Sequence, residues 1–414
     1  MRAVNDAAPA DPETATAPVR TGQRIAALDV LRGIALFGIF IMNMPGFTHS
    51  VFVQPVADAS ALDRIVSALR DTLFAGKFNL LFGMLFGIGF TLQLARLEAA
   101  HASRAVWIYA RRLAALLAIG LVHAVLLWSG DVLVVYAVLG FGLLTLRKVS
   151  ERTVLVALAF CLVFPAASDA LRPSLLSIRT ETVATFEYED FEASNDAAFG
   201  HGSFLDAAKE TARVFAWGYT SPLGLFSYAS FYVQMATGML LGFLVGRRGW
   251  AARLPELGAT VRRARIVAAT TVAASAIAWA WASASDLAMS ASALQVFASG
   301  LAKTAGRAAL MAFYALTVVG LLQRPGAARW AMPFERAGRM PLSNYLLQTL
   351  MASFVFYGWG LGFWGRPGPA QETALAVALF VAVQLPVSVW WMGRFRYGPV
   401  EYLWRLVTYG RGAL

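Results

Sequence analysis

Long apolar segments separated by short polar stretches recur along almost the whole chain. A helix of about 20 apolar residues crosses the hydrocarbon layer of a bilayer. The pattern predicts ten membrane-spanning helices, at residues 25–44, 74–95, 112–128, 131–146, 153–170, 223–246, 265–284, 301–322, 341–361 and 373–393. We therefore expect an all-α integral membrane protein, with a single polytopic membrane domain at 24–414 and little room for a separate soluble domain.

Two segments fall outside this pattern. Residues 1–23 are rich in Ala, Pro and Thr and lack an apolar core, so they predict a disordered N-terminal tail. The longest loop, at about 171–222, carries the acidic residues Glu187, Glu189, Asp190 and Glu192. Within it, residues 204–217 have the pattern of an amphipathic helix lying along the outer interface. The loop is either a solvated cap or a lid over an outward-facing site.

Basic residues gather in alternate connecting segments, which sets the orientation. With the N-terminus inside, the inner segments hold 25 of the 35 Lys and Arg residues, and the net charge is +16 inside against −5 outside. Because positive residues concentrate on the cytoplasmic side, both termini are predicted to be cytoplasmic. The same distribution explains the overall charge of +11 by topology and contacts with anionic lipid headgroups, so we expect no nucleic-acid partner.

The first span carries a polar stripe. At about 100° per residue, Asp29, Arg32 and Asn43 fall within about 60° of one another. Asp29 and Arg32 can form a structural ion pair, or Arg32 can bind the phosphate of a donor. His49 follows the outer end of this span, where it is either a surface residue or a general base.

Other polar residues lie within the predicted spans, where they tend to face the bundle interior. Lys77 either extends to the outer headgroups or counters a negative charge that develops near His49. His123 and Asp131 form a second acid–base candidate or a buried structural pair. Asn344 and Gln348, one turn apart, either hydrogen-bond between helices or line a polar path. We find no metal-ligand cluster, and the single cysteine, Cys161, forms no intramolecular disulfide.

Several motifs resemble those of the YeiB-like bacterial membrane proteins, a family of unknown function. They are Leu31-Arg32-Gly33 with Asn43, Gly76-Lys77-Phe78, Trp128-Ser129-Gly130-Asp131, Gly338-Arg339-Met340-Pro341, and Phe395-Arg396-Tyr397-Gly398-Pro399. The N-terminal half is also similar to transmembrane acyltransferases of the heparan-α-glucosaminide N-acetyltransferase type. Those enzymes move an acyl group from cytoplasmic acyl-CoA to a sugar across the membrane, using a histidine beyond the first helix. His49 is the nearest match.

The resemblance implies a multi-pass acyltransferase of the bacterial cytoplasmic (inner) membrane. Acyl-CoA would bind at the inner side, with Asp29, Arg32, Arg339, Asn344 and Gln348 as the binding residues. His49 would take the acceptor proton, Asn43 or Lys77 would stabilise the oxyanion, and His123 with Asp131 is the reserve pair. The acceptor would be a cell-envelope sugar or lipid-linked glycan, and a homo-oligomer is possible.

Two other functions remain open. One is a transporter or flippase of a small molecule or lipid-linked intermediate, which ten spans and the polar residues Asn344 and Gln348 would suit. The other is a non-catalytic membrane partner of an envelope assembly. Uptake into proteoliposomes without covalent change would favour the first.

Overall fold

Every regular element in the described part of the chain is helical. The computed structural model describes residues 26–50, 60–100, 103–175, 190–250, 253, 258–286 and 292–410. The predicted tail at 1–23, Glu187 and Glu189 lie outside these ranges. The elements are α1 (Ala26–Asn43), α2 (Pro45–Thr48), α3 (Ala61–Leu73), α4 (Lys77–Ala100), α5 (Ala105–Leu126), α6 (Leu133–Leu146), α7 (Glu151–Leu175), η3 (Asp196–His201), α9 (Phe204–Thr220), α10 (Pro222–Arg247), α11 (Gly258–Asp286), α12 (Ala293–Leu322), α13 (Ala327–Arg339), α14 (Pro341–Phe356), α15 (Pro369–Leu379), η5 (Phe380–Gln384), α16 (Leu385–Arg394) and α17 (Pro399–Tyr409).

The helices have the length and composition of a membrane protein. Seven helical segments of the described chain are long and apolar enough to cross a bilayer, and α6 is a shorter apolar helix. Large apolar side chains such as Val156, Ile277 and Leu294 are mostly exposed on the outside of the bundle, where lipid would cover them. The expected all-α membrane architecture is therefore confirmed. The count of ten spans and the cytoplasmic position of both termini stay predictions.

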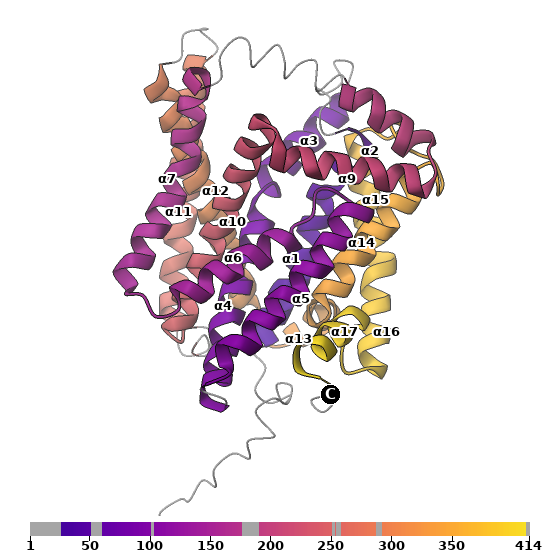
Figure 1. Cartoon of the computed structure of the whole chain (residues 1–414). Helices are drawn as coiled ribbons and strands as arrows, with labels where there is room; N and C mark the ends of the chain where they lie inside the picture. The colour runs from indigo at the N-terminus through magenta and orange to yellow at the C-terminus, as the bar shows by residue number, and fades with distance from the viewer. Residues whose placement is uncertain are drawn as a thin grey trace, which may run out of the picture.

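The two ends of the bundle differ in what covers them. At one end α9 lies across the bundle and packs against α5 and α10, and at the other end lie α13 and α17 (Figure 1). A capping box starts α9, in which Ser203 and Asp206 bond each other's backbone N–H groups. A proline stands in the first turn of α10, α14, α15 and α17. Proline suits this position because an N–H in the first turn has no partner within the helix, so its absence costs no hydrogen bond.

Glycines bring α4 and α10 into close contact. A Cβ on Gly87 would lie 2.2 Å from the carbonyl oxygen of Met239, and one on Gly242 would lie 1.9 Å from that of Met84. Only glycine allows two backbones to approach so closely. Gly83 and Gly87 on α4 and Gly238 and Gly242 on α10 are each spaced four residues apart, which allows two helices to approach closely within lipid.

Some boundaries differ from the sequence expectation. The span expected at 341–361 ends at Phe356, because the chain turns back through a glycine-rich stretch in which Gly358 N–H bonds the carbonyl of Phe199. The described part of the loop expected at 171–222 is largely helical. Three further amphipathic helices are present: α3 and α13 lie where connecting segments were expected, and α17 follows the last expected span.

Candidate functional site

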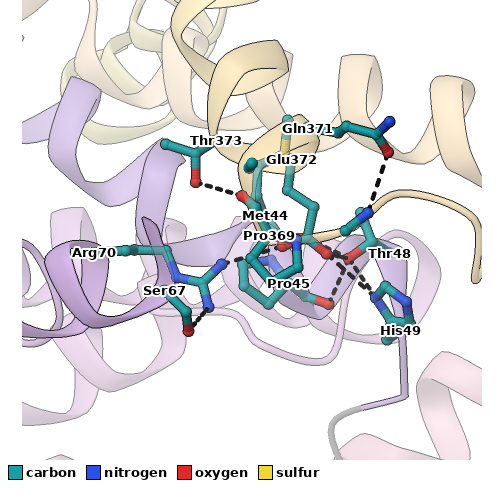
Figure 2. Close-up of polar contacts among 12 residues, drawn as sticks. Met44, Pro45, Thr48, His49, Ser67, Arg70, Pro369, Gln371, Glu372 and Thr373 are labelled. Carbon is teal, nitrogen blue, oxygen red and sulfur yellow. Dashed lines mark hydrogen bonds and ion pairs between the residues drawn. The ribbon is translucent and has the colours of Figure 1, made fainter. Parts of the chain in front are cut away.

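His49 lies directly after α2 and contacts a carboxylate from the last third of the chain. Its ring Nδ1 is 3.2 Å from Oε1 of Glu372 and 3.0 Å from Oγ1 of Thr48. The Thr48 hydroxyl donates to the same Glu372 oxygen. On the other side of the carboxylate, Arg70 of α3 donates to Oε2 at 3.1 Å. Figure 2 shows the four side chains converging from α2, α3 and α15. We call Thr48, His49, Arg70 and Glu372 the His49 cluster.

The contacts of the His49 cluster decide which ring nitrogen of His49 carries a proton in the neutral imidazole. An ionised carboxylate only accepts hydrogen bonds, so Nδ1 of His49 must carry the proton where it faces Glu372. This assignment follows from the bonding network. In the neutral ring, Nε2 then keeps its lone pair and can accept a proton. Glu372 is buried, with a side chain 3% exposed, whereas the His49 side chain is 33% exposed. A buried carboxylate thus orients an accessible base.

Several neighbouring elements hold the His49 cluster in place. The Phe47 ring stacks on Trp128 at 4.4 Å between centroids, and the Trp128 indole N–H donates to the carbonyl of Gly46. Thr48 O accepts from Gly365 N–H. Asp63 of α3 accepts from the backbone N–H of Ala370, which ties α3 to the start of α15. The Trp128 motif therefore supports the short helix that presents His49.

His123 and Asp131 form a second network, which is completely enclosed. Nδ1 of His123 lies 2.8 Å from Asp131, and Nε2 lies 2.9 Å from the hydroxyl of Thr349 on α14. The other Asp131 oxygen accepts from the backbone N–H of Val134. The His123 side chain is 1% exposed. The carboxylate, imidazole and hydroxyl are in the order found in hydrolytic triads. However, the His123 and Asp131 side chains are almost completely buried, so no substrate reaches this network in the described structure.

Lys77 and Asn43 lie near the same end of the bundle but outside the hydrogen bonds of the His49 cluster. The ammonium group of Lys77 donates to the carbonyl oxygen of Asp71 at 2.8 Å and is buried. Asn43 is the last residue of α1 and is half-buried. Among the described residues its amide has no hydrogen-bonding partner, so it is available to a ligand.

The end of the polar stripe that carries Asp29 and Arg32 lies at a close helix crossing. Arg32 donates to Asp29 at 2.5 Å, so the ion pair is present. A Cβ on Gly338 would lie 1.8 Å from the carbonyl of Asp29, and one on Gly33 would lie 2.0 Å from that of Phe334. The Leu31-Arg32-Gly33 and Gly338-Arg339 motifs therefore pack against each other where α1 crosses α13. The Arg32 side chain is 26% exposed there.

Asn344 and Gln348 use their amides in helix packing. Asn344 donates to Ala337 O and to Ser388 Oγ, and Gln348 donates to Leu36 O and to Gln384 Oε1. All four side chains in this group are at most 3% exposed. These bonds join α14 to α1, α13, η5 and α16. They give the two amides a structural role, and their assignment to acyl-CoA binding has no support from their surroundings.

Glu401 of α17 caps the start of α14. Its carboxylate accepts from the backbone N–H groups of Leu342 and Ser343 and from the Ser343 hydroxyl. Burial raises the pKa of Glu401 above its ordinary value, against the opposing effect of these donors. The Pro399-containing motif thus anchors α17 to the start of α14.

Sequence reasoning missed Thr48, Arg70 and Glu372 of the His49 cluster and Thr349 of the His123 network. Glu372 stands 324 positions from Thr48, so no local spacing could have joined them. The available signal was a carboxylate within the first turn of an apolar helix, where an unpaired charge is costly. Within the described ranges, no group of three or more His, Cys, Asp or Glu residues could hold a metal ion.

Comparison with known proteins places the chain in a family. The family described as "Protein of unknown function (DUF418)" matches residues 245–411. An uncharacterized protein of Bacillus subtilis, YxaH, is 31% identical over 405 residues, covering 95% of this chain and 96% of its own. The chain belongs to the YeiB-like, DUF418 family. Its relatives include YeiB of Escherichia coli, 28% identical over 93% of this chain and 96% of its own, also uncharacterized. No solved structure matches the chain.

The expected membership of the YeiB-like family is confirmed. The DUF418 match contains Glu372 but begins after His49 and Arg70. The YxaH and YeiB alignments, in contrast, cover almost the whole chain. Their names report no activity, so the family identifies the protein without assigning its chemistry.

Proposed function

We propose that this protein is a membrane acyltransferase in which His49 acts as the general base. The observation that carries the proposal is the pairing of His49 with Glu372. A buried carboxylate holds Nδ1, and the accessible ring leaves Nε2 for a substrate. A general base must lie within hydrogen-bonding distance of the proton that it removes, and another group must hold it in the right orientation. In the His49 cluster, Glu372 is the orienting group.

In this mechanism Nε2 of His49 takes the proton from an acceptor hydroxyl as its oxygen attacks the acyl carbonyl. Glu372 stabilises the imidazolium that forms. Arg70 and Thr48 keep the carboxylate in place. The amide of Asn43, at the end of α1 and without a hydrogen-bonding partner among the described residues, would donate to the developing oxyanion. The proton then leaves through His49 to the thiolate of the departing coenzyme, which balances the transfer.

The acyl donor would bind at the opposite end of α1, near Arg32. Asn43 is eleven positions after Arg32 on α1, which is about 17 Å of helix rise. The donor therefore has to be long and flexible, with an anionic end that stays at the basic inner surface. An acyl-CoA has this shape and charge, and the guanidinium of Arg32 suits its phosphates.

A lipid-linked acceptor is favoured over a free sugar. An apolar groove of about 550 Å³ is lined by Val66 of α3 and by Ala370, Thr373, Ala374 and Val377 of α15, among others. The lining residues Ala370 and Thr373 stand on either side of Glu372 in α15, and the groove opens to the outside of the bundle. A hydrocarbon chain in this groove would bring the polar group that it carries close to the His49 cluster.

The test is incorporation of label from acyl-labelled CoA into an envelope lipid and glycan extract by purified protein. We expect His49→Ala to reduce transfer by at least about a hundredfold. His201→Ala is the matched control, because His201 is an exposed histidine in η3 outside the His49 cluster. Unchanged transfer by His49→Ala would remove His49 from the mechanism. Uptake of a substrate without covalent change would instead favour the transporter alternative.

A further inference from the structure

A polar cavity lies inside the bundle, apart from the His49 cluster. It has a volume of about 290 Å³ and lies among α4, α7, α10 and α12, which run beside one another on one side of the molecule (Figure 1). Its walls include Leu80, Cys161, Ser230, Gln234, Thr304 and Arg307. Its lining contains no residue of α2, α3 or α15, so it is a separate site.

Arg307 gives this cavity a positive charge without a close counter-ion. Among the described residues, no carboxylate lies within 4 Å of its guanidinium, and no hydrogen bond joins it to another group. Asp169, on the exposed rim, acts on it only at longer range. The buried Lys77 is a second positive group close enough to interact with Arg307 electrostatically. A cation in an apolar bundle is costly unless an anion accompanies it.

Neutral donors surround the same space. The amide nitrogen of Gln234 lies 2.6 Å from the position that a Cβ on Gly76 would occupy, and Cδ of Arg307 lies 3.5 Å from it. Both side chains therefore lie beside this glycine. Gly76 has φ of 77°, a conformation that favours glycine and leaves the space to these two side chains. Ser227 and Ser230 add hydroxyl groups from α10. A guanidinium with amide and hydroxyl donors is the set that recognises phosphate oxygens.

We propose that this cavity binds a phosphate group, supplied either by an anionic lipid headgroup or by a soluble phosphate or diphosphate. Its volume suits a small anionic group rather than a glycan. Its exposed rim residues, Asp169 and Ser227, lie toward the same ends of α7 and α10 as α9, so a ligand enters from that end. The proposal is independent of acyl transfer at His49.

The test measures ligand binding by native mass spectrometry on the purified, full-length protein. One arm adds phosphatidylglycerol, with phosphatidylcholine as the lipid control, and the other adds inorganic diphosphate. We expect Arg307→Gln to weaken binding of the preferred probe at least tenfold. Lys303→Gln is the matched control, because Lys303 lies one turn away on α12 with an exposed side chain. It removes the same charge outside the cavity and should change binding less than twofold.

A second variant keeps the test decisive if Arg307→Gln fails to fold. Ser227 is exposed at the cavity rim, so Ser227→Trp should block entry without disturbing the core. Preference for phosphatidylglycerol that diphosphate does not displace identifies a lipid headgroup site. Binding of diphosphate without lipid preference identifies a soluble anion. Absence of binding of either probe to the unaltered protein, or equal binding by Arg307→Gln and Lys303→Gln, overturns the proposal.

Discussion

Replacing Glu372 by glutamine tests the His49 cluster because no orientation of the new amide satisfies its neighbours. If the amide oxygen faces Thr48 and His49, the NH₂ group points at the Arg70 guanidinium, and two donors oppose each other. If the amide is turned over, its NH₂ group faces His49 Nδ1. The ring must then carry its proton on Nε2, where it can no longer act as a base.

The expected loss of stability follows from burial of the pair. The Arg70 side chain is 11% exposed and that of Glu372 is 3% exposed, so neither charge is well solvated. Leaving one partner of a buried ion pair alone costs about 3–5 kcal/mol, and an amide recovers part of this by accepting one bond. We expect Glu372→Gln to lower the free energy of unfolding by about 2–4 kcal/mol, and acyl transfer to fall by at least about a hundredfold.

The assay is reversible unfolding in mixed micelles, followed by circular dichroism, alongside labelled acyl transfer. Asp71→Asn is the matched control, since Asp71 is a second carboxylate near Arg70, at 3.6 Å, with a side chain 66% exposed. An exposed pair contributes little, so we expect a change below about 0.5 kcal/mol. The double variant Arg70→Gln/Glu372→Gln should cost less than the two single changes together. Equal unfolding of Glu372→Gln and Asp71→Asn would refute the buried ion pair.

Three further predictions follow from the packing and the polar networks. His123→Ala should lower the free energy of unfolding by about 2–4 kcal/mol, because it leaves Asp131 and Thr349 buried without their partner. In the same unfolding assay, His49→Ala should lower it by less than about 1 kcal/mol. Gly242→Ala should lower the free energy of unfolding by about 1–3 kcal/mol, because its Cβ would collide with the Met84 carbonyl. The control Gly142→Ala on α6, where a Cβ would have nothing within 4 Å, should be neutral or slightly stabilising. Similar effects of the two variants would contradict the close contact of α4 with α10. Burial raises the pKa of Glu401, so the stability that this residue contributes is greatest below the ordinary carboxyl pKa and declines as pH rises through the raised value. The free energy of unfolding of Glu401→Gln, relative to the unaltered protein, should therefore increase with pH. A difference that does not vary with pH would contradict this sign.

The membrane helices were predictable because apolar length is a local property of the sequence. The expected span at 223–246 matches α10 to within a residue at each end. In contrast, α13 alternates charged and apolar residues and carries Pro333 inside the helix, so no apolar window reveals it. Its helix depends on packing against α1, where Gly33 and Gly338 allow contact.

The site was only partly predictable for a related reason. His49 stood out as a polar residue above a polar stripe, but its orienting partner lies in another apolar helix far along the chain. Apolar context predicts that Glu372 needs a partner without indicating which one. For His123 and Asp131, the tight turn at Ser129-Gly130 made them neighbours, and the structure adds Thr349 as the group that encloses them.

The residues of the His49 cluster come from two parts of the chain, and the DUF418 match covers only one of them. The base and the arginine come from the first fifth of the sequence, whereas the carboxylate lies inside the DUF418 segment at 245–411. A protein that matches this segment alone could keep the orienting carboxylate and lack the base. Sorting the family by whether a histidine stands after the first helix, rather than by the C-terminal match, would separate members able to carry out this chemistry from those that retain only the scaffold.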